Sequence, residues 1–233
     1  MAAKHAMMPG NQSDRTDRTD PFFLETDRVV LRRFTPADVD NLTDLNSDPE
    51  VMRFITGGTP IPRDEIEHDV LPRFLRSYER AGGFGTWAAI DKAGGEFLGW
   101  FAFHPADGAG LEEVELGYRL RKAVWGKGYG TEVARALVRK GFTELGVRRV
   151  VATADRVNYG SRRVMEKAGL IHVRTFRFAD PWPHLPEGPE QDGVDYALSK
   201  AEWEQREDTR EQRPGSSQED PGRCSDPFAG AGD

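Results

Sequence analysis

Cysteine is almost missing from this sequence: its 233 residues include one, Cys224, near the C-terminus. A single cysteine excludes an intramolecular disulfide framework and a cysteine-rich zinc site, and it favours a reducing compartment. Long apolar runs are missing too. No window approaches the roughly 18 apolar residues of a membrane span, and MAAKHAMMPGNQSD at the N-terminus lacks the apolar run of a secretory signal. We therefore expect a cytoplasmic protein with no membrane partner.

The chain also lacks an excess of positive charge. Its net charge of -7 argues against binding to a nucleic-acid backbone and mildly favours cationic ligands, although solubility alone accounts for it. Both ends are poor in apolar residues and have no core-forming pattern. Residues 1–20 and 204–233 are therefore predicted to be disordered tails, the second of them acidic. The remaining residues, 21–203, are predicted to form one domain.

Strand and helix patterns alternate along this domain. Strands are predicted over 28–34, 84–91, 97–104, 111–120, 147–154, 170–178 and 194–199. Helices are predicted over 35–46, 63–81, 131–145 and 158–169, and Pro72 should kink or split the second of them. The order β-α-α-β-β-β-α-β-α-β-β predicts a mixed α/β fold, with an antiparallel meander followed by a strand-helix-strand crossover.

Glycine is concentrated just before one of these helices, in WGKGYGTEVARAL (125–137). Gly126, Gly128 and Gly130 alternate, and a helix pattern follows at once. Such a loop suits an anion, because free main-chain N–H groups converge at a helix N-terminus. The spacing fits neither a Walker A loop nor a dinucleotide fingerprint, whose third glycine position holds Thr131 here. For the glycines alone, a tight turn with close helix packing is an equal alternative.

The sequence around this loop extends the pattern. ELGYRLRKAVWGKGYGTEVARAL (115–137) is followed by NYGSRRVMEKAGL (158–170), with LETDRVVLRRFTPADVDNL before them and VDYALSKAEW after. In this order, over about residues 24–203, the chain resembles the GNAT superfamily of acyl-CoA-dependent N-acyltransferases, and most closely its RimJ/RimL-like branch. The resemblance implies the GNAT fold, with acetyl-CoA as cosubstrate and no metal. It also implies direct transfer of the acetyl group to a primary amine.

The resemblance further assigns residues to the cosubstrate. Main-chain N–H groups of the loop would bind the pyrophosphate of coenzyme A, the strand before the loop would pair with the pantetheine arm, and the N-x-x-S segment would lie near the thiol. Trp125 departs from the Gln or Arg of the superfamily, but Trp is common in this branch. The residues so implied are Tyr118, Leu120, Trp125, Gly126, Lys127, Gly128, Tyr129, Gly130, Thr131, Asn158 and Ser161.

Two residues are candidates for the chemistry of amide formation. Glu115 is the candidate general base, acting through a water, although it is equally interpreted as a solvated strand carboxylate. The tyrosine that many members of the superfamily use as general acid falls on Met165 here and is therefore absent. Ser161 is the remaining hydroxyl, and its alternative role is to cap the first helical turn.

The acceptor is left open by the sequence. It is either a protein N-terminus or a small amine such as a polyamine, an amino acid or an aminoglycoside. The long loop 179–193 offers Asp180, Trp182 and His184 as candidate lining of an amine pocket, and His104 is a further candidate contact. A non-catalytic acyl-CoA-binding sensor domain is the alternative function, supported by the missing tyrosine. The sequence is also compatible with a homodimer.

Overall fold

The structure, a computed structural model, describes residues 22–79, 83–106, 110–177 and 192–211. The predicted N-terminal tail therefore lies outside the described residues, as do residues 212–233 and most of the candidate loop 179–193, including Asp180, Trp182 and His184. Among the helices that the structure describes, none is both long and apolar enough to cross a membrane.

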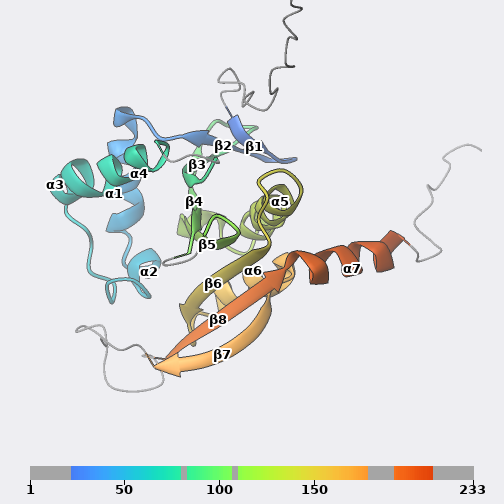
Figure 1. The fold of residues 1–233 in the computed structure, drawn as a ribbon. Helices are drawn as coiled ribbons and strands as arrows, with labels where there is room; N and C mark the ends of the chain where they lie inside the picture. The colour runs from blue at the N-terminus through green and yellow to red at the C-terminus, as the bar shows by residue number, and fades with distance from the viewer. Residues whose placement is uncertain (1–21, 80–82, 107–109, 178–191, 212–233) are drawn as a thin grey trace, which may run out of the picture.

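The centre of the fold is one eight-stranded mixed sheet in the order β1-β2-β3-β4-β5-β6-β8-β7 (Figure 1). Neighbouring strands run antiparallel except β5 and β6, which are parallel. The predicted mixed α/β class is thus confirmed, and all seven predicted strands are present. The strands are β1 (Phe22–Glu25), β2 (Val29–Arg33), β3 (Gly85–Asp91), β4 (Phe97–Pro105), β5 (Glu113–Leu120), β6 (Arg149–Asp155), β7 (Ile171–Arg177) and β8 (Asp192–Ser199).

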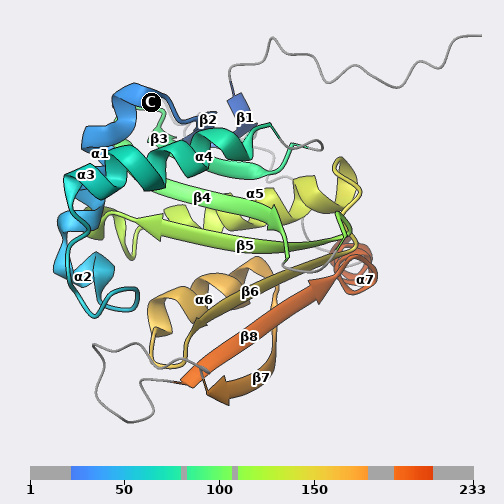
Figure 2. The ribbon, with the colours of Figure 1, turned by 60° about the vertical axis from the view of Figure 1, so that its left-hand side comes forward.

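Helices cover both faces of the sheet (Figure 2). Helices α1 to α4 pack on one face over a cluster that includes Leu42, Ile66 and Ala88. Helices α5 and α6 pack on the other face over Leu137 and Met165. The helices are η1 (Pro36–Asp38), α1 (Val39–Ser47), α2 (Pro49–Met52), α3 (Arg63–Glu65), the π-turn η2 (Ile66–Val70), α4 (Leu71–Ser77), η3 (Lys122–Val124), α5 (Tyr129–Thr143), α6 (Tyr159–Ala168) and α7 (Lys200–Glu211).

The first helices have a capped start and an interruption before Pro72. Thr35 and Asp38 form a capping box before α1, and Arg32 donates to both carboxylate oxygens of Asp38 at 2.7 and 2.8 Å. The predicted split at Pro72 takes the form of the π-turn η2 directly before it. Proline has no N–H to donate, and the N–H of Leu71 instead reaches back to the carbonyl of Ile66.

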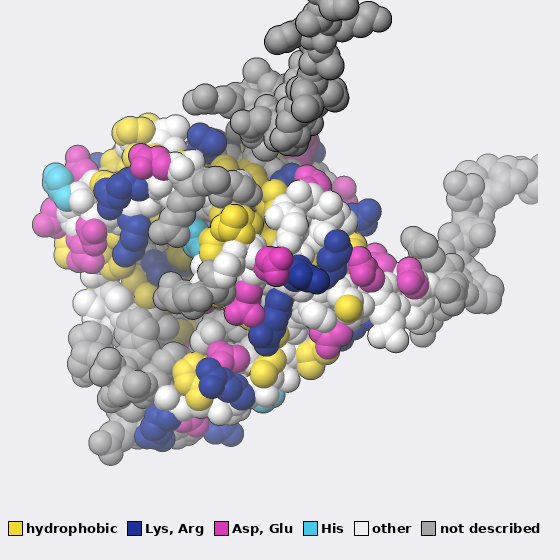
Figure 3. Space-filling view, in the orientation of Figure 1, with side chains coloured by type: hydrophobic (Ala, Val, Ile, Leu, Met, Phe, Trp, Pro, Cys, Tyr) yellow, Lys and Arg dark blue, Asp and Glu magenta, His cyan; other side chains and the backbone are white. Residues whose placement is uncertain are grey.

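The C-terminal helix extends past residue 203, where the domain was predicted to end. Helix α7 continues from Lys200 to Glu211, so the prediction of disorder is wrong for residues 204–211. Trp203 anchors this helix, because its ring lies 5.6 Å from that of Phe142 on α5. The helix is otherwise strongly charged. Figure 3 shows acidic and basic side chains interspersed along it and over the neighbouring strands.

Candidate active site

A cavity of about 790 Å³ opens where two parallel strands separate. β5 and β6 pair only at Glu113↔Arg149, Val114↔Val150 and Glu115↔Val151. Beyond Glu115, β5 stays paired with β4 as far as Leu120, while β6 stays paired with β8 as far as Asp155. The two strands therefore diverge, and within the described part of the chain the main-chain groups of β5 that face β6 have no strand partner there. Pairing of β5 with a pantetheine arm, which the resemblance implies, requires a separation of this kind.

The glycine loop closes one end of this cavity, and its three glycines serve two purposes. Gly126 and Gly128 adopt φ of 73° and 87°, which L-residues with a side chain rarely adopt. Gly130 is helical, and a Cβ there would lie 3.3 Å from Val164 and 3.4 Å from Leu120. The first two glycines therefore shape the turn before α5, and the third lets α5 pack closely on α6 and β5. The alternative of a tight turn with close helix packing is therefore present, and binding of an anion by the loop stays a prediction.

Arg28, at the start of β2, fixes the loop from outside the cavity. Its Nη1 donates to the carbonyl of Lys127 at 3.0 Å, and its Nε donates to Glu132 at 2.7 Å. The guanidinium also stacks on the ring of Tyr129, 4.3 Å from its centroid. Partial burial alone would raise the pKa of Glu132, but hydrogen bonds from Thr26 and Arg28 hold it below its usual value. Glu132 is thus a carboxylate in the first turn of α5, where it complements the helix dipole.

Trp125 ties the loop to the end of β5. Its indole N–H donates to the carbonyl of Leu120 at 2.8 Å, and almost half of the side chain is exposed. This carbonyl is the last of β5, at the edge of the cavity. Trp125, which stands where the superfamily has Gln or Arg, therefore has a structural role here. The sequence did not reveal this role.

Tyr118 and Ser161 meet across the cavity. The phenol oxygen of Tyr118 lies 2.9 Å from both the carbonyl oxygen and the Oγ of Ser161. Burial raises the pKa of Tyr118 to about 12, against a smaller lowering by the hydrogen bond with Ser161. The side chain of Asn158 accepts from the main-chain N–H of Ser161 at 3.1 Å, so Asn158 caps α6. Met165, at the expected tyrosine position, is buried in the core.

The cavity brings together most of the predicted cofactor residues but leaves out two. Lys127 and Tyr129 are not part of its lining: the carbonyl of Lys127 faces Arg28, and the hydroxyl of Tyr129 donates to Asp91 at 3.2 Å. The predicted residues that do line it are Tyr118, Leu120, Trp125, Gly126, Gly128, Gly130, Thr131, Asn158 and Ser161.

Glu115 lies outside the lining of the cavity. It is exposed, at the last position where β5 pairs with β6, and it faces His104 across the β4–β5 pairing. Since side chains alternate along a strand, Glu115 and Arg119 share the sheet face covered by α1–α4, while Tyr118 is on the opposite face. His104 lies 2.9 Å from the hydroxyl of Thr86 through its Nε2.

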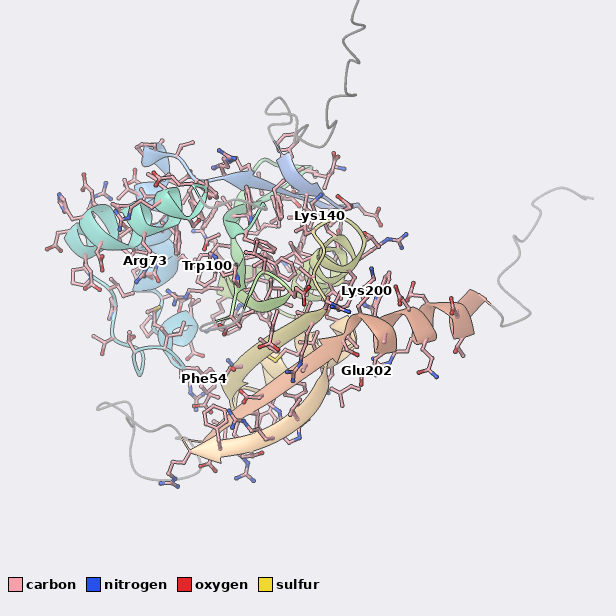
Figure 4. The ribbon with its side chains drawn as sticks, viewed as in Figure 1. Phe54, Arg73, Trp100, Lys140, Lys200 and Glu202 are labelled. Atoms are coloured by element: carbon pink, nitrogen blue, oxygen red, sulfur yellow. The ribbon has the colours of Figure 1, made fainter. Side chains whose placement is uncertain are left out.

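Several residues of the cavity carried no recognisable signal in the sequence. The segment after α2 contributes Arg53, Phe54 and Ile55, and α6 contributes the cations Arg163 and Lys167. Phe54 lies between α2 and the lower part of the sheet (Figure 4), and Arg53 stacks on it at 5.2 Å. A shallower groove continues outward from the loop, lined by Gly128, Thr131, Glu132, Arg135 and Lys167.

Comparisons with known proteins agree with this geometry. A family model described as an acetyltransferase (GNAT) domain matches residues 28–171. The FsC-acetyl coenzyme A-N(2)-transacetylase of Aspergillus fumigatus is 35% identical over 167 residues, which cover 68% of this chain and 68% of that protein. The uncharacterized protein YkkB of Bacillus subtilis is 34% identical, over 66% of this chain and 88% of that protein.

Solved structures share the fold. A GNAT-family acetyltransferase from Bacillus anthracis superposes with a TM-score of 0.63 at 25% identity, covering 76% of this chain and 98% of that one. The ribosomal L7/L12 alpha-N-protein acetyltransferase RimL, solved in complex with coenzyme A, superposes with a TM-score of 0.61 over 76% of this chain and 97% of that one. Its sequence identity is 17%, so this second likeness is one of fold alone.

Proposed function

Because the chain belongs to the GNAT acetyltransferase family, we propose that the cavity between β5 and β6 binds acetyl-CoA and directs its acetyl group to a primary amine. Family membership makes the chain an acetyl-CoA-dependent N-acetyltransferase. The observation that carries the proposal is the divergence of β5 from β6 after Glu115, directly beside a glycine loop at a helix N-terminus. Acetyl-CoA supplies a thioester, which is activated for acyl transfer.

The residues present suit this cosubstrate. The N-terminus of α5 offers main-chain N–H groups and a partial positive charge to a diphosphate, and Gly126 and Gly128 leave the backbone open there. Arg163 and Lys167 add positive charge to the lining. The unpaired main-chain groups of β5 suit the amide groups of a pantetheine arm. A cavity of about 790 Å³ lies within the range of small-molecule sites.

We assign the general base to Glu115, acting through a water on the incoming amine. It lies on the sheet face covered by α1–α4, opposite the face of Tyr118. The acceptor then approaches from the α1–α4 side while the cosubstrate lies between the strands. A carboxylate in this position removes the proton that the amine must lose before or during attack.

We assign protonation of the leaving thiolate to the Tyr118–Ser161 pair. With a pKa of about 12 the phenol stays protonated at neutral pH, so Tyr118 is a donor. Ser161, held by Asn158, has a hydroxyl within hydrogen-bond distance of that phenol. The tyrosine that is missing at Met165 thus has a counterpart on β5.

A small amine is the acceptor class that we favour over a protein N-terminus. The relative at 35% identity is named FsC-acetyl coenzyme A-N(2)-transacetylase, a name without any protein N-terminus, whereas RimL, named for a protein N-terminus, is 17% identical. The net charge of -7 also favours an acceptor with a cationic amine.

The test is thiol release from acetyl-CoA with a panel of small amines and N-terminal peptides, together with calorimetric titration of coenzyme A. We expect coenzyme A to bind and small amines to be turned over faster than peptides. If coenzyme A binds while every amine stays at background, the sensor-domain alternative holds and the proposed function is wrong. Turnover of peptides alone would contradict the acceptor class.

A further inference from the structure

One arginine in the lining of the cavity has no acidic partner among the described residues. Arg119 lies on β5 directly opposite Trp100 of β4, and its guanidinium lies 5.3 Å from the indole centroid. Its Nη1 donates to the side-chain oxygen of Asn46 on α1, and its Nε is buried without a hydrogen-bond partner among the described residues. Arg119 also lines the cavity.

The charged side chain with a resolved effect on Arg119 is Arg73, which has the same sign. Burial and the nearby Arg73 lower the pKa of Arg119 to about 10. Arg73 of α4 and Trp100 of β4 lie where the first helices meet the sheet (Figure 4). Arg53, from the segment after α2, lines the same cavity. Glu50 and Asp155 also line the cavity, but within the described residues no carboxylate forms an ion pair with Arg119.

Such an arrangement is costly unless something compensates it. A buried guanidinium without a counter-ion loses hydration that neutral hydrogen bonds replace only in part. Asn46 is itself buried and donates to the carbonyl of Leu42 at 2.6 Å, so it holds the guanidinium in one orientation. A planar, oriented guanidinium is suited to a carboxylate.

We propose that Arg119 binds a carboxylate of the acceptor, so that the acceptor is a small amine that also carries a carboxylate. The inference rests on the proposed function, and it restricts the acceptor class from small amines to small amines with a carboxylate. The phosphates of the cosubstrate are not the expected partner of Arg119. The loop at 126–131, Arg163 and Lys167 are available to them, and Arg119 is on the sheet face of Glu115, where the acceptor approaches.

The experiment compares amines that differ only in this charge. Lysine, ornithine and 4-aminobutyrate are each paired with the corresponding carboxamide, and kcat/KM is measured by thiol release. Arg119→Gln and Arg119→Lys are tested beside the matched control Arg121→Gln. Arg121 is a half-buried neighbour directly after β5 that pairs with Asp44 at 3.9 Å and does not line the cavity. Calorimetric titration of coenzyme A and thermal unfolding accompany each variant.

We expect the wild-type protein to prefer at least one acid over its carboxamide. Arg119→Gln should lower kcat/KM for that acid by about 30-fold or more, as for loss of one partner of a buried ion pair, and leave the carboxamide and coenzyme A affinity nearly unchanged. Arg119→Lys, which keeps the charge but not the planar group, should give an intermediate ratio. If Arg119→Gln does not fold, the ratio of kcat/KM for the acid to kcat/KM for its carboxamide in Arg119→Lys tests the assignment of Arg119.

Turnover without any preference for the acids, or an equal loss for acid and carboxamide in the Arg119 variants, would overturn the assignment of Arg119 while the proposed function stands. A loss of acid preference in Arg121→Gln as large as that in Arg119→Gln would overturn the assignment as well. No turnover of any amine would overturn the proposed function and this inference together.

Discussion

Replacing Gly128 with alanine separates the role of the glycine loop in binding from its role in folding. Gly128 has a φ of 87°, and a Cβ there would lie 3.3 Å from Nη2 of Arg28. A side chain in this left-handed conformation costs about 1–2 kcal/mol. For a domain of this size, each kcal/mol lowers Tm by roughly 2–4 °C. Gly128→Ala should therefore unfold a few degrees below the wild-type protein.

The effect on binding should be larger than the effect on folding. Relief of the strain shifts Arg28, which holds the carbonyl of Lys127 and the carboxylate of Glu132. The N–H groups at the start of α5 then lose their alignment. Loss of one hydrogen bond to a charged group costs about 1.5–3 kcal/mol, so the Kd of coenzyme A should rise about 10- to 100-fold. Calorimetric titration measures this.

Gly95→Ala is the matched control. Gly95 has a φ of 70° in the turn between β3 and β4, and a Cβ there would meet no atom within 4 Å. It should lower Tm about as much as Gly128→Ala and leave the Kd of coenzyme A unchanged. If Gly128→Ala also binds coenzyme A with the wild-type Kd, the glycine loop is not the diphosphate site and the reasoning is refuted.

Three further predictions concern the proposed chemistry and acid stability. Glu115→Gln should lower kcat about 100-fold or more with little change in coenzyme A affinity; an unchanged kcat would remove Glu115 as base. Tyr118→Phe should lower kcat, and because burial raises the pKa of Tyr118 to about 12, wild-type activity should show no loss from this phenol up to pH ~10; a kcat equal to wild type would contradict the donor role. Burial opposes ionisation of Asp38, but its bonds with Arg32 prevail and lower the pKa to about 2. Its contribution of about 2 kcal/mol is present above pH ~4 and is lost as pH falls towards 2. Asp38→Asn should therefore be less stable than wild type at pH 7, and chemical denaturation should find the two equal at pH ~2.

The periodic parts of the fold could be predicted from the sequence, because a buried strand or helix face repeats locally. Very short elements and elements with few apolar residues could not. The four-residue strand β1 is too short for a pattern, and α7 has only Ala201 and Trp203 as apolar residues. Its packing on Phe142 joins residues from distant parts of the chain, so composition alone indicated disorder.

The candidate site divides in the same way. The loop at 125–131 and the Asn158–Ser161 cap are local patterns, and the cavity includes most of their residues. The contacts of Arg28 with Glu132 and of Arg119 with Asn46 span 104 and 73 residues and have no local signature. The separation of β5 from β6 is likewise set by which main-chain pairs form, and neither strand sequence specifies this.

A crystal structure of the protein with coenzyme A would show whether the cavity between β5 and β6 holds this cosubstrate. We predict the diphosphate within hydrogen-bond distance of main-chain N–H groups of residues 126–131, and the pantetheine arm between β5 and β6 beyond Glu115. Coenzyme A bound elsewhere, or β5 and β6 paired along their whole length with no ligand between them, would contradict it.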